Sequence, residues 1–299
     1  MRRFFYSLCF FFVILMMFSI PFVGYYDYYG EYDWAYKRFL NDGERSLVIG
    51  TSRAAQGIHP EVIYKELRGN GFNLPIYNFS FSRPTSPYGE VYYNAIKKKI
   101  SDECYTNGLF VVSVDPWSLS DNGDSCQLQE SKGCLSYVNF FMRPNLQYIY
   151  KNFKQLSRSS SMRLHDDGWL EVDVPMDSAS VAKRMERKKI DYQDAIIEKS
   201  HYRLSWLAKT IDLLKKRGTV VLCRIPADEY FIDMENKFWP SFEIDMEKLA
   251  DKYSVKYISF INTISDYRTT DGNHLFKEDG ERFTRNLCDS IKLIFNLDK

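Results

Sequence analysis

Residues 46–53 read Ser-Leu-Val-Ile-Gly-Thr-Ser-Arg, and the fold is inferred outward from this stretch. Its first half is short and apolar, which is typical of a strand buried in a parallel sheet. A glycine, a threonine and a serine follow directly. Parallel α/β sheets place their sites outside the carboxyl ends of their strands. Ser52 is therefore expected at such a site.

Strand and helix patterns alternate on either side of a long middle segment. The predicted strands are residues 46–50, 76–81, 109–114, 219–225 and 255–261, and the predicted helices are 60–67, 87–100, 196–216, 242–253 and 278–295. This alternation predicts an α/β fold with a doubly wound, five-stranded parallel sheet and right-handed crossovers. The sheet domain is expected at residues 45–116 and 195–299.

The middle segment, residues 117–194, follows the third strand and is rich in glycine, asparagine, serine and aromatic residues. It is too long for a simple connection between a strand and a helix. Because it leaves the sheet at the edge where sites form, we interpret it as an inserted lid or substrate-binding subdomain.

Composition narrows the functional classes. The chain has 299 residues, is 45% hydrophobic and 26% charged, and has a net charge of +1. These values are typical of a globular protein and argue against disorder as the main state. The near-neutral charge argues against a nucleic-acid-binding protein. The sequence has no glycine-rich phosphate loop, no nucleotide fingerprint and no zinc-like cysteine spacing, so we expect neither a cofactor nor a metal.

The first 25 residues differ from the rest. Arg2 and Arg3 precede an uncharged apolar run over residues 4–23, which is long enough to cross a bilayer as a helix. The exit from the run lacks the small residues of a cleavage site and is rich in tyrosine, which favours an uncleaved anchor. A cleaved signal peptide and a buried soluble helix remain the alternatives. With an anchor at residues 1–25 and a juxtamembrane segment at 26–44, the remainder is expected outside the cytoplasm.

The cysteines are compatible with that location. Cys126 and Cys134 flank a short polar loop and are candidates for a small disulfide. Cys223 and Cys288 lie in apolar patterns and are expected to be packed thiols.

A second motif follows the last predicted strand, where the chain reads Asp271-Gly-Asn-His274. This spacing allows Asp271 to accept a hydrogen bond from one ring nitrogen of His274 while the other nitrogen faces outward. Ser52, His274 and Asp271 would then be nucleophile, base and orienting carboxylate. Taken singly, each motif has an ordinary structural explanation: a turn after a strand, or a helix cap beside a surface histidine. Their positions at the ends of the first and last strands favour the triad.

Gly50-Thr51-Ser52 near the start and Asp271-Gly-Asn-His274 near the end resemble the first and last motif blocks of the SGNH/GDSL hydrolase superfamily. The resemblance covers about residues 45–295 without the middle segment. It implies a flavodoxin-like sheet, ester chemistry, and the same roles for Ser52, His274 and Asp271. The anchor and the divergent central blocks look like the membrane-anchored polysaccharide O-acyltransferase branch. That branch implies a cell-surface glycan substrate and a multispanning membrane acyltransferase as partner.

The central blocks depart from the family pattern. No asparagine stands at the block directly after the third strand, where the chain has Asp115 instead. The backbone N–H of Ser52 is one expected oxyanion donor, and Ser82 after the second strand is a candidate for another. Asp115 either binds substrate or pins its own loop. Arg53 and Arg83 either contact an anionic substrate or pair with carboxylates.

Two functional classes therefore compete. The first is an extracytoplasmic enzyme that acts on a cell-surface polysaccharide through an acyl-Ser52 intermediate. It either transfers an acyl group, expected to be acetyl, or hydrolyses an ester. The alternative is a non-catalytic glycan-binding or assembly protein that retains a hydrolase fold, which the incomplete oxyanion set favours.

Overall fold

The structure is a computed structural model. It describes residues 2–29, 38, 43–82, 86–101, 103, 105–121, 161–193 and 198–297. The chain divides into two compact units, of which the first comprises Met1–Leu40 and Gln129–Leu164. The second unit comprises Asn41–Leu128 and His165–Lys299. We call the second the sheet unit, because it holds the central sheet and all residues of the site described below.

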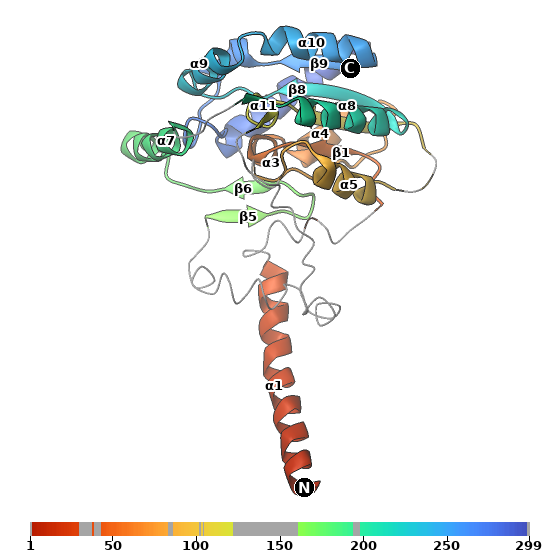
Figure 1. Cartoon of the computed structure of the whole chain (residues 1–299), viewed down its shortest axis with the longest axis vertical. Coiled ribbons are helices and arrows are strands. Elements are labelled where there is room, and N and C mark those ends of the chain that lie inside the picture. Colours follow the sequence, from red (N-terminus) through yellow and green to blue (C-terminus); the bar gives the residue numbers. More distant parts are fainter. Residues whose placement is uncertain are drawn as a thin grey trace. The chain divides into compact units, whose positions relative to one another are not determined.

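The central sheet has five parallel strands in the order β2-β1-β3-β8-β9. Figure 1 labels β1, β8 and β9 of this sheet. The strands are β1 (Leu47–Ile49), β2 (Tyr77–Asn78), β3 (Gly108–Ser113), β8 (Gly218–Arg224) and β9 (Lys256–Ser259). Numbered along the sheet this is the order 2-1-3-4-5, which is that of flavodoxin-like proteins. The predicted fold class of the sheet is therefore confirmed.

Register places alternate strand residues on one face. Val48 pairs with Val111, and Val111 with Val221. All three lie in one buried cluster with Ile63 of α4 (Pro60–Leu67) and Leu287 of α11 (Lys277–Ile294). Burial of this apolar row against α4 and α11 stabilises the sheet and fixes α11 on the same face as the helix that follows β1.

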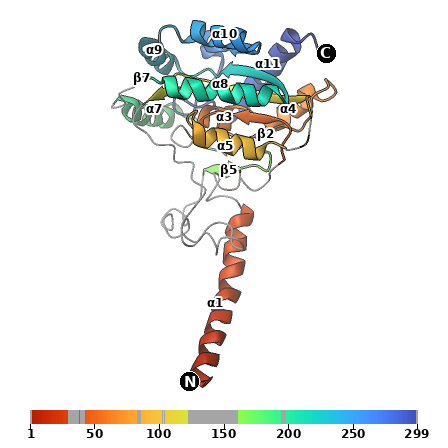
Figure 2. The same cartoon turned by 45° about the vertical axis from the view of Figure 1, so that its right-hand side comes forward.

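The opposite face is covered by α5 (Glu90–Lys99), α8 (His201–Lys215) and α10 (Phe242–Tyr253). Helix α8 packs against β8, α5 and α10, and Figure 2 shows α8 and α5 side by side. Helices on both faces agree with the predicted double winding.

Several predicted boundaries were wrong. The helix predicted from residue 196 begins at His201, because Ser200 is its N-cap and accepts a hydrogen bond from the N–H of Arg203. Strand β2 is only two residues long. Three helices lie outside the predicted helix ranges: α3 (Ser52–Gly57), α7 (Ser178–Gln193) and α9 (Glu229–Phe238).

The remaining elements are short or N-terminal. They are α1 (Arg2–Tyr29), β4 (Ser120–Asp121), β5 (Met162–Leu164), β6 (Leu170–Val172), β7 (Glu198–Lys199) and the 3-10 helix η2 (Ile261–Asp266). Strand β7 pairs with β4 antiparallel, and so ties the start of α8 to the chain that follows β3.

Within the part of the chain that is described, no helix has both the length and the apolar character needed to span a membrane. The predicted anchor at residues 1–25 is therefore not confirmed. Cys126 and Cys134 and most of the predicted subdomain at 117–194 lie outside the described residues, so the disulfide and the subdomain boundaries stay predictions. Cys223 and Cys288 are buried free thiols, as expected.

Candidate active site

Ser52 is the first residue of α3 and follows β1 after a sharp turn. The turn requires glycine at position 50. A Cβ atom there would lie 2.7 Å from the Cβ of Ser113 and 3.0 Å from that of Ala54, closer than side chains normally approach. Gly50 therefore lets β1 run directly into α3 beside β3. This close approach brings Ser52 to the carboxyl edge of the sheet.

Buried polar side chains hold this turn in place. The N–H of Gly50 donates to the hydroxyl of Tyr92 at 3.1 Å, and the hydroxyl of Ser86 donates to the carbonyl of Gly50 at 2.8 Å. The side-chain amide of Asn78 donates to the carbonyls of Ala54 and Ile58, both at 2.9 Å. These contacts fix α3 against the neighbouring strands, so the position of Ser52 does not depend on its own side chain.

The second motif forms a tight loop before α11. One carboxylate oxygen of Asp271 accepts from the backbone N–H groups of Asn273 and His274, each at 3.0 Å. Gly272 has a φ of +83°, and a Cβ atom there would lie 2.5 Å from the ring of Phe231. The loop therefore needs glycine at its second position and a short acidic side chain at its first.

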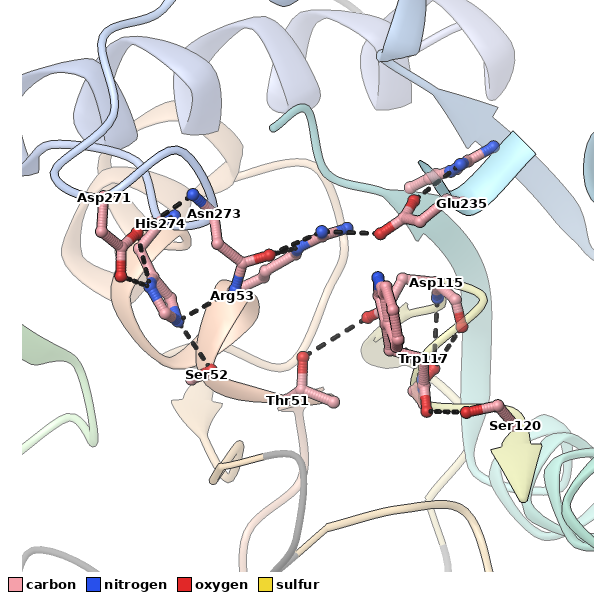
Figure 3. Close-up of polar contacts among 12 residues, drawn as sticks. Thr51, Ser52, Arg53, Asp115, Trp117, Ser120, Glu235, Asp271, Asn273 and His274 are labelled. Carbon is pink, nitrogen blue, oxygen red and sulfur yellow. Dashed lines mark hydrogen bonds and ion pairs between the residues drawn. The ribbon is translucent and has the colours of Figure 1, made fainter. Parts of the chain in front are cut away.

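The two loops meet, as Figure 3 shows. Nε2 of His274 lies 2.8 Å from Oγ of Ser52, although the residues are 222 positions apart. Nδ1 of His274 lies 2.9 and 3.0 Å from the two carboxylate oxygens of Asp271. Helix α11 packs against α3 and α4, which carries the loop before it to the start of α3. The structure thus brings Ser52, His274 and Asp271 together in the order that nucleophilic catalysis needs.

Electrostatics suit the same roles. Burial by itself would raise the pKa of Asp271, but the facing imidazole and the hydrogen bonds from His274 and the backbone hold the pKa of that carboxyl well below its usual range. Asp271 is therefore ionised at neutral pH, where it can fix the ring of His274 and stabilise an imidazolium.

Arg53 does not meet the expectation of a substrate contact. Its side chain is only 3% exposed and forms an ion pair of 2.6 Å with Glu235 of α9. It also donates to Oδ1 of Asn273 from Nε at 3.0 Å and from Nη2 at 2.6 Å. The alternative of pairing with a carboxylate is therefore the one observed. The reason is that burial requires the guanidinium to find a partner inside the protein.

Asp115 is also an internal residue. It is 2% exposed, accepts from the N–H of Ser118 at 2.8 Å, and receives a long 3.4 Å contact from the hydroxyl of Thr51. Burial raises the pKa of Asp115, while Arg53 nearby opposes that rise. Asp115 thus pins the loop after β3, which leaves the prediction of substrate binding without support.

The structure describes Ser82, one of the two remaining candidates, but not Arg83. Ser82 lies in the segment after β2, where the N–H of the preceding Phe81 donates to the carbonyl of Gly50. The backbone carbonyl of Ser82 accepts a hydrogen bond from the N–H of Ser86 at 2.9 Å. This segment adjoins the turn before Ser52, and the role of Ser82 as an oxyanion donor stays a prediction. Arg83 lies outside the described residues.

Two tryptophans make their contacts within the sheet unit. Trp117 is 3% exposed in a cluster with Tyr192 and Phe231. Trp169 donates from its ring nitrogen to the carbonyl of Gln56 and stacks on His59 at 4.1 Å. Among the described residues, no group of three or more histidines, cysteines and carboxylates is placed to hold a metal.

Two residues of the site were missed at the level of sequence. Asn273 stands inside the Asp271–His274 motif, but no role was assigned to it. Glu235 lies in an unpredicted helix, and no local pattern pointed to its burial. Adjacency to His274 was the one signal available for Asn273.

No family model and no curated protein matches the sequence. Solved structures to which the chain is similar include a lipase/acylhydrolase from Enterococcus faecalis, at 12% identity over 85% of this chain and 98% of that chain, with a TM-score of 0.40. A carbohydrate acetylesterase from Sinorhizobium meliloti is 12% identical over 84% of this chain and 100% of that chain, with a TM-score of 0.41. An aryl esterase from M. smegmatis is 9% identical over 83% and 98%, with a TM-score of 0.36.

The chain's own features carry the family likeness. The sheet order places β1 between β2 and β3, and the loops after the first and last strands meet at Ser52 and His274. The chain resembles the SGNH/GDSL hydrolases. It departs from their pattern after β3, where the SGNH block would supply an asparagine and this chain has Asp115 in an internal contact.

Proposed function

We propose that the protein is a serine-dependent esterase or acyltransferase that works through an acyl-Ser52 intermediate. The observation that carries this proposal is the 2.8 Å contact between Oγ of Ser52 and Nε2 of His274, with Asp271 bound to the other ring nitrogen. A serine hydroxyl is a weak nucleophile until a base takes its proton, and a neutral imidazole is suited to that task near pH 7.

The reaction proceeds in two halves. His274 takes the proton of Ser52 as Oγ bonds to the acyl carbon, and the carbonyl oxygen becomes an oxyanion. The intermediate collapses when the ester C–O bond breaks and the leaving alcohol takes the proton from His274. Water or an acceptor hydroxyl then repeats the sequence on the acyl-enzyme. Water releases a carboxylic acid, whereas an acceptor hydroxyl yields a new ester.

The backbone of Ser52 supplies one oxyanion donor in this scheme. Ser52 opens α3, and the first N–H groups of a helix have no acceptor within it. A single donor is worth about 3–4 kcal/mol of transition-state stabilisation, so a second is expected to matter.

We further propose that the substrate is a cell-surface polysaccharide, which carries the ester in the hydrolysis reaction or accepts the acyl group in the transfer reaction. In the transfer reaction, a multispanning membrane acyltransferase would be a partner. The support for an extracytoplasmic location is the sequence order of Arg2 and Arg3 before an uncharged apolar run. A reporter enzyme that is active only outside the cytoplasm, fused after residue 299, tests the location. A fusion that accumulates in the cells but leaves the reporter inactive contradicts it.

The test of the chemistry uses a fluorophosphonate probe and p-nitrophenyl acetate on the full chain. We expect the wild type to be labelled and to release p-nitrophenol, and the Ser52→Ala variant to do neither. The matched control is Ser205→Ala, which removes an exposed serine of α8 and should leave both signals unchanged. Labelling that persists in Ser52→Ala removes the proposed nucleophile. Glycan binding without labelling of the wild type favours the non-catalytic alternative.

Hydrolysis and transfer are separated by their products. Free acetate released from an acetylated polysaccharide without an added acceptor indicates an esterase. Acetate release that falls as an acceptor glycan is added, with acetyl groups appearing on the acceptor, indicates a transferase.

A further inference from the structure

The side-chain amide of Asn273 has its orientation determined by its surroundings. Its Oδ1 faces Nε and Nη2 of Arg53, at 3.0 and 2.6 Å. A guanidinium only donates hydrogen bonds, so the atom that faces it must be the amide oxygen. The amide nitrogen is therefore turned the other way, and it lies 3.4 Å from Nε2 of His274 (Figure 3).

That amide nitrogen has donor capacity to spare. Nε2 of His274 is 2.8 Å from Oγ of Ser52 and accepts the serine proton. Its lone pair is thus engaged, and a 3.4 Å contact from Asn273 is long for a hydrogen bond. The N–H groups of Asn273 therefore lie next to the ring nitrogen that contacts Ser52, and their one contact with that nitrogen is long.

The side chain of Asn273 is held by a row of buried charged side chains. Arg53 pairs with Glu235 at 2.6 Å, and Glu235 pairs with Arg224 of β8 at 2.7 Å. Arg53 is 3% exposed and the other two are fully buried. Buried charges are tolerated only when they are paired in good geometry. The row from Arg224 to Asn273 is thus joined by buried ion pairs and hydrogen bonds, and it ends beside His274.

Among the described residues, the loop after β3 has no asparagine donor of the kind that SGNH proteins have there. The loop after β3 carries Asp115, whose carboxylate is occupied by the N–H of Ser118. A carboxylate would in any case repel an oxyanion. The amide of Asn273 has the donor chemistry that this position lacks, and it lies 3.4 Å from Nε2 of His274 in the loop before α11.

We propose that Asn273 is a catalytic residue that donates a hydrogen bond from Nδ2 to the acyl oxygen as it becomes an oxyanion, with Arg53 as the residue that positions it. This inference rests on the proposed function. The bond strengthens as negative charge develops, so it lowers the barrier more than it tightens substrate binding.

The test compares an ester with its thionoester, in which sulfur replaces the carbonyl oxygen. Sulfur accepts hydrogen bonds weakly, so the thionoester draws little benefit from an amide donor. For Asn273→Ala we expect kcat/KM to fall about 10²–10³-fold with the ester and far less with the thionoester. The control Asn286→Ala removes an exposed amide on α11 and should leave the ester-to-thionoester ratio unchanged.

An equal loss with both substrates overturns the proposal, because a displaced His274 would slow both reactions alike. A second variant, Asn273→Asp, keeps a partner for Arg53 and should fold, while its carboxylate opposes the oxyanion. We expect its ester activity to be no higher than that of Asn273→Ala, and activity near that of the wild type contradicts the proposal. Arg53→Lys keeps the charge beside Glu235 but loses the two hydrogen bonds to Oδ1 of Asn273, so the ester-to-thionoester ratio of kcat/KM should also fall. An unchanged ratio in this variant removes the positioning role of Arg53.

The wild type separates the two levels of inference. A wild type with no Ser52-dependent hydrolysis overturns the proposed function and the role of Asn273 with it. Ser52-dependent hydrolysis with an unchanged ratio in Asn273→Ala overturns the role of Asn273 alone.

Discussion

Nη2 of Arg53 lies 2.6 Å from Oε1 of Glu235, and both side chains are buried next to the triad. The same carboxylate binds Arg224 at 2.7 Å through its other oxygen. One acidic side chain thus forms ion pairs with two guanidinium groups, one beside the nucleophile and one on β8. This arrangement links the stability of the sheet unit to the geometry of the site.

Glu235→Ala should therefore destabilise the protein strongly, because it leaves Arg53 unpaired in the interior and deprives Arg224 of one of its two carboxylates. We expect a loss of about 3–5 kcal/mol in the free energy of unfolding, measured by urea denaturation. The matched control is Glu186→Ala, which breaks an exposed pair with Lys189 on α7 and should cost less than about 1 kcal/mol. Similar losses in the two variants would contradict the structural role of the buried pairs.

The triad makes a kinetic prediction. Ser52→Ala and His274→Ala should each lower kcat for an activated ester by about 10⁴-fold or more, and the double variant should lose no more than either single one, because the residues act as a unit. Asp271→Asn should lower kcat by about 10⁴-fold, since the amide favours the wrong tautomer of His274. Steady-state rates on p-nitrophenyl acetate measure these losses. Multiplicative effects in the double variant would show that Ser52 and His274 do not act together.

Gly50 makes a steric prediction. In Gly50→Ala the new methyl group would meet Ser113 and Ala54, so the turn before Ser52 must shift. We expect a loss of about 1–3 kcal/mol in stability together with a fall in kcat. The double variant Gly50→Ala/Ser113→Gly removes the closest contact and should recover part of both. Full activity in Gly50→Ala would mean that the turn tolerates the methyl group without moving Ser52.

His59 makes a prediction about pH. Burial against Trp169 lowers its pKa to about 3, below the value of about 6.5 in an unfolded chain. Between these values the unfolded state binds more protons than the folded state. The contribution of His59 to the free energy of unfolding is therefore constant above pH 6.5 and falls as the pH drops toward 3, by at most about 1.4 kcal/mol per pH unit. In His59→Phe, which keeps an aromatic ring, urea denaturation between pH 7 and 4 should show a shallower slope. Identical slopes would exclude His59 as the cause.

The local patterns of the chain predicted a good part of this protein. The patterns located all five strands, although not their exact ends, and gave the helices Pro60–Leu67 and Phe242–Tyr253 the bounds that the structure shows. Strand ends in a parallel sheet share one edge, so Ser52 and the Asp271–His274 motif could be assigned to that edge from their positions in the chain. These inferences depend on residues that are neighbours in sequence, or on rules that hold for every such sheet.

Only the tertiary structure determined which of the other charged residues are buried and which partners they have. Arg53 looked equally suited to a substrate and to a carboxylate, and its partner Glu235 lies in a helix that no pattern predicted. Whether a charge is buried, and which partner it meets there, depends on how distant segments pack. The orientation of Asn273 follows from that same packing, because a side-chain amide turns to suit whichever donor the fold brings against it.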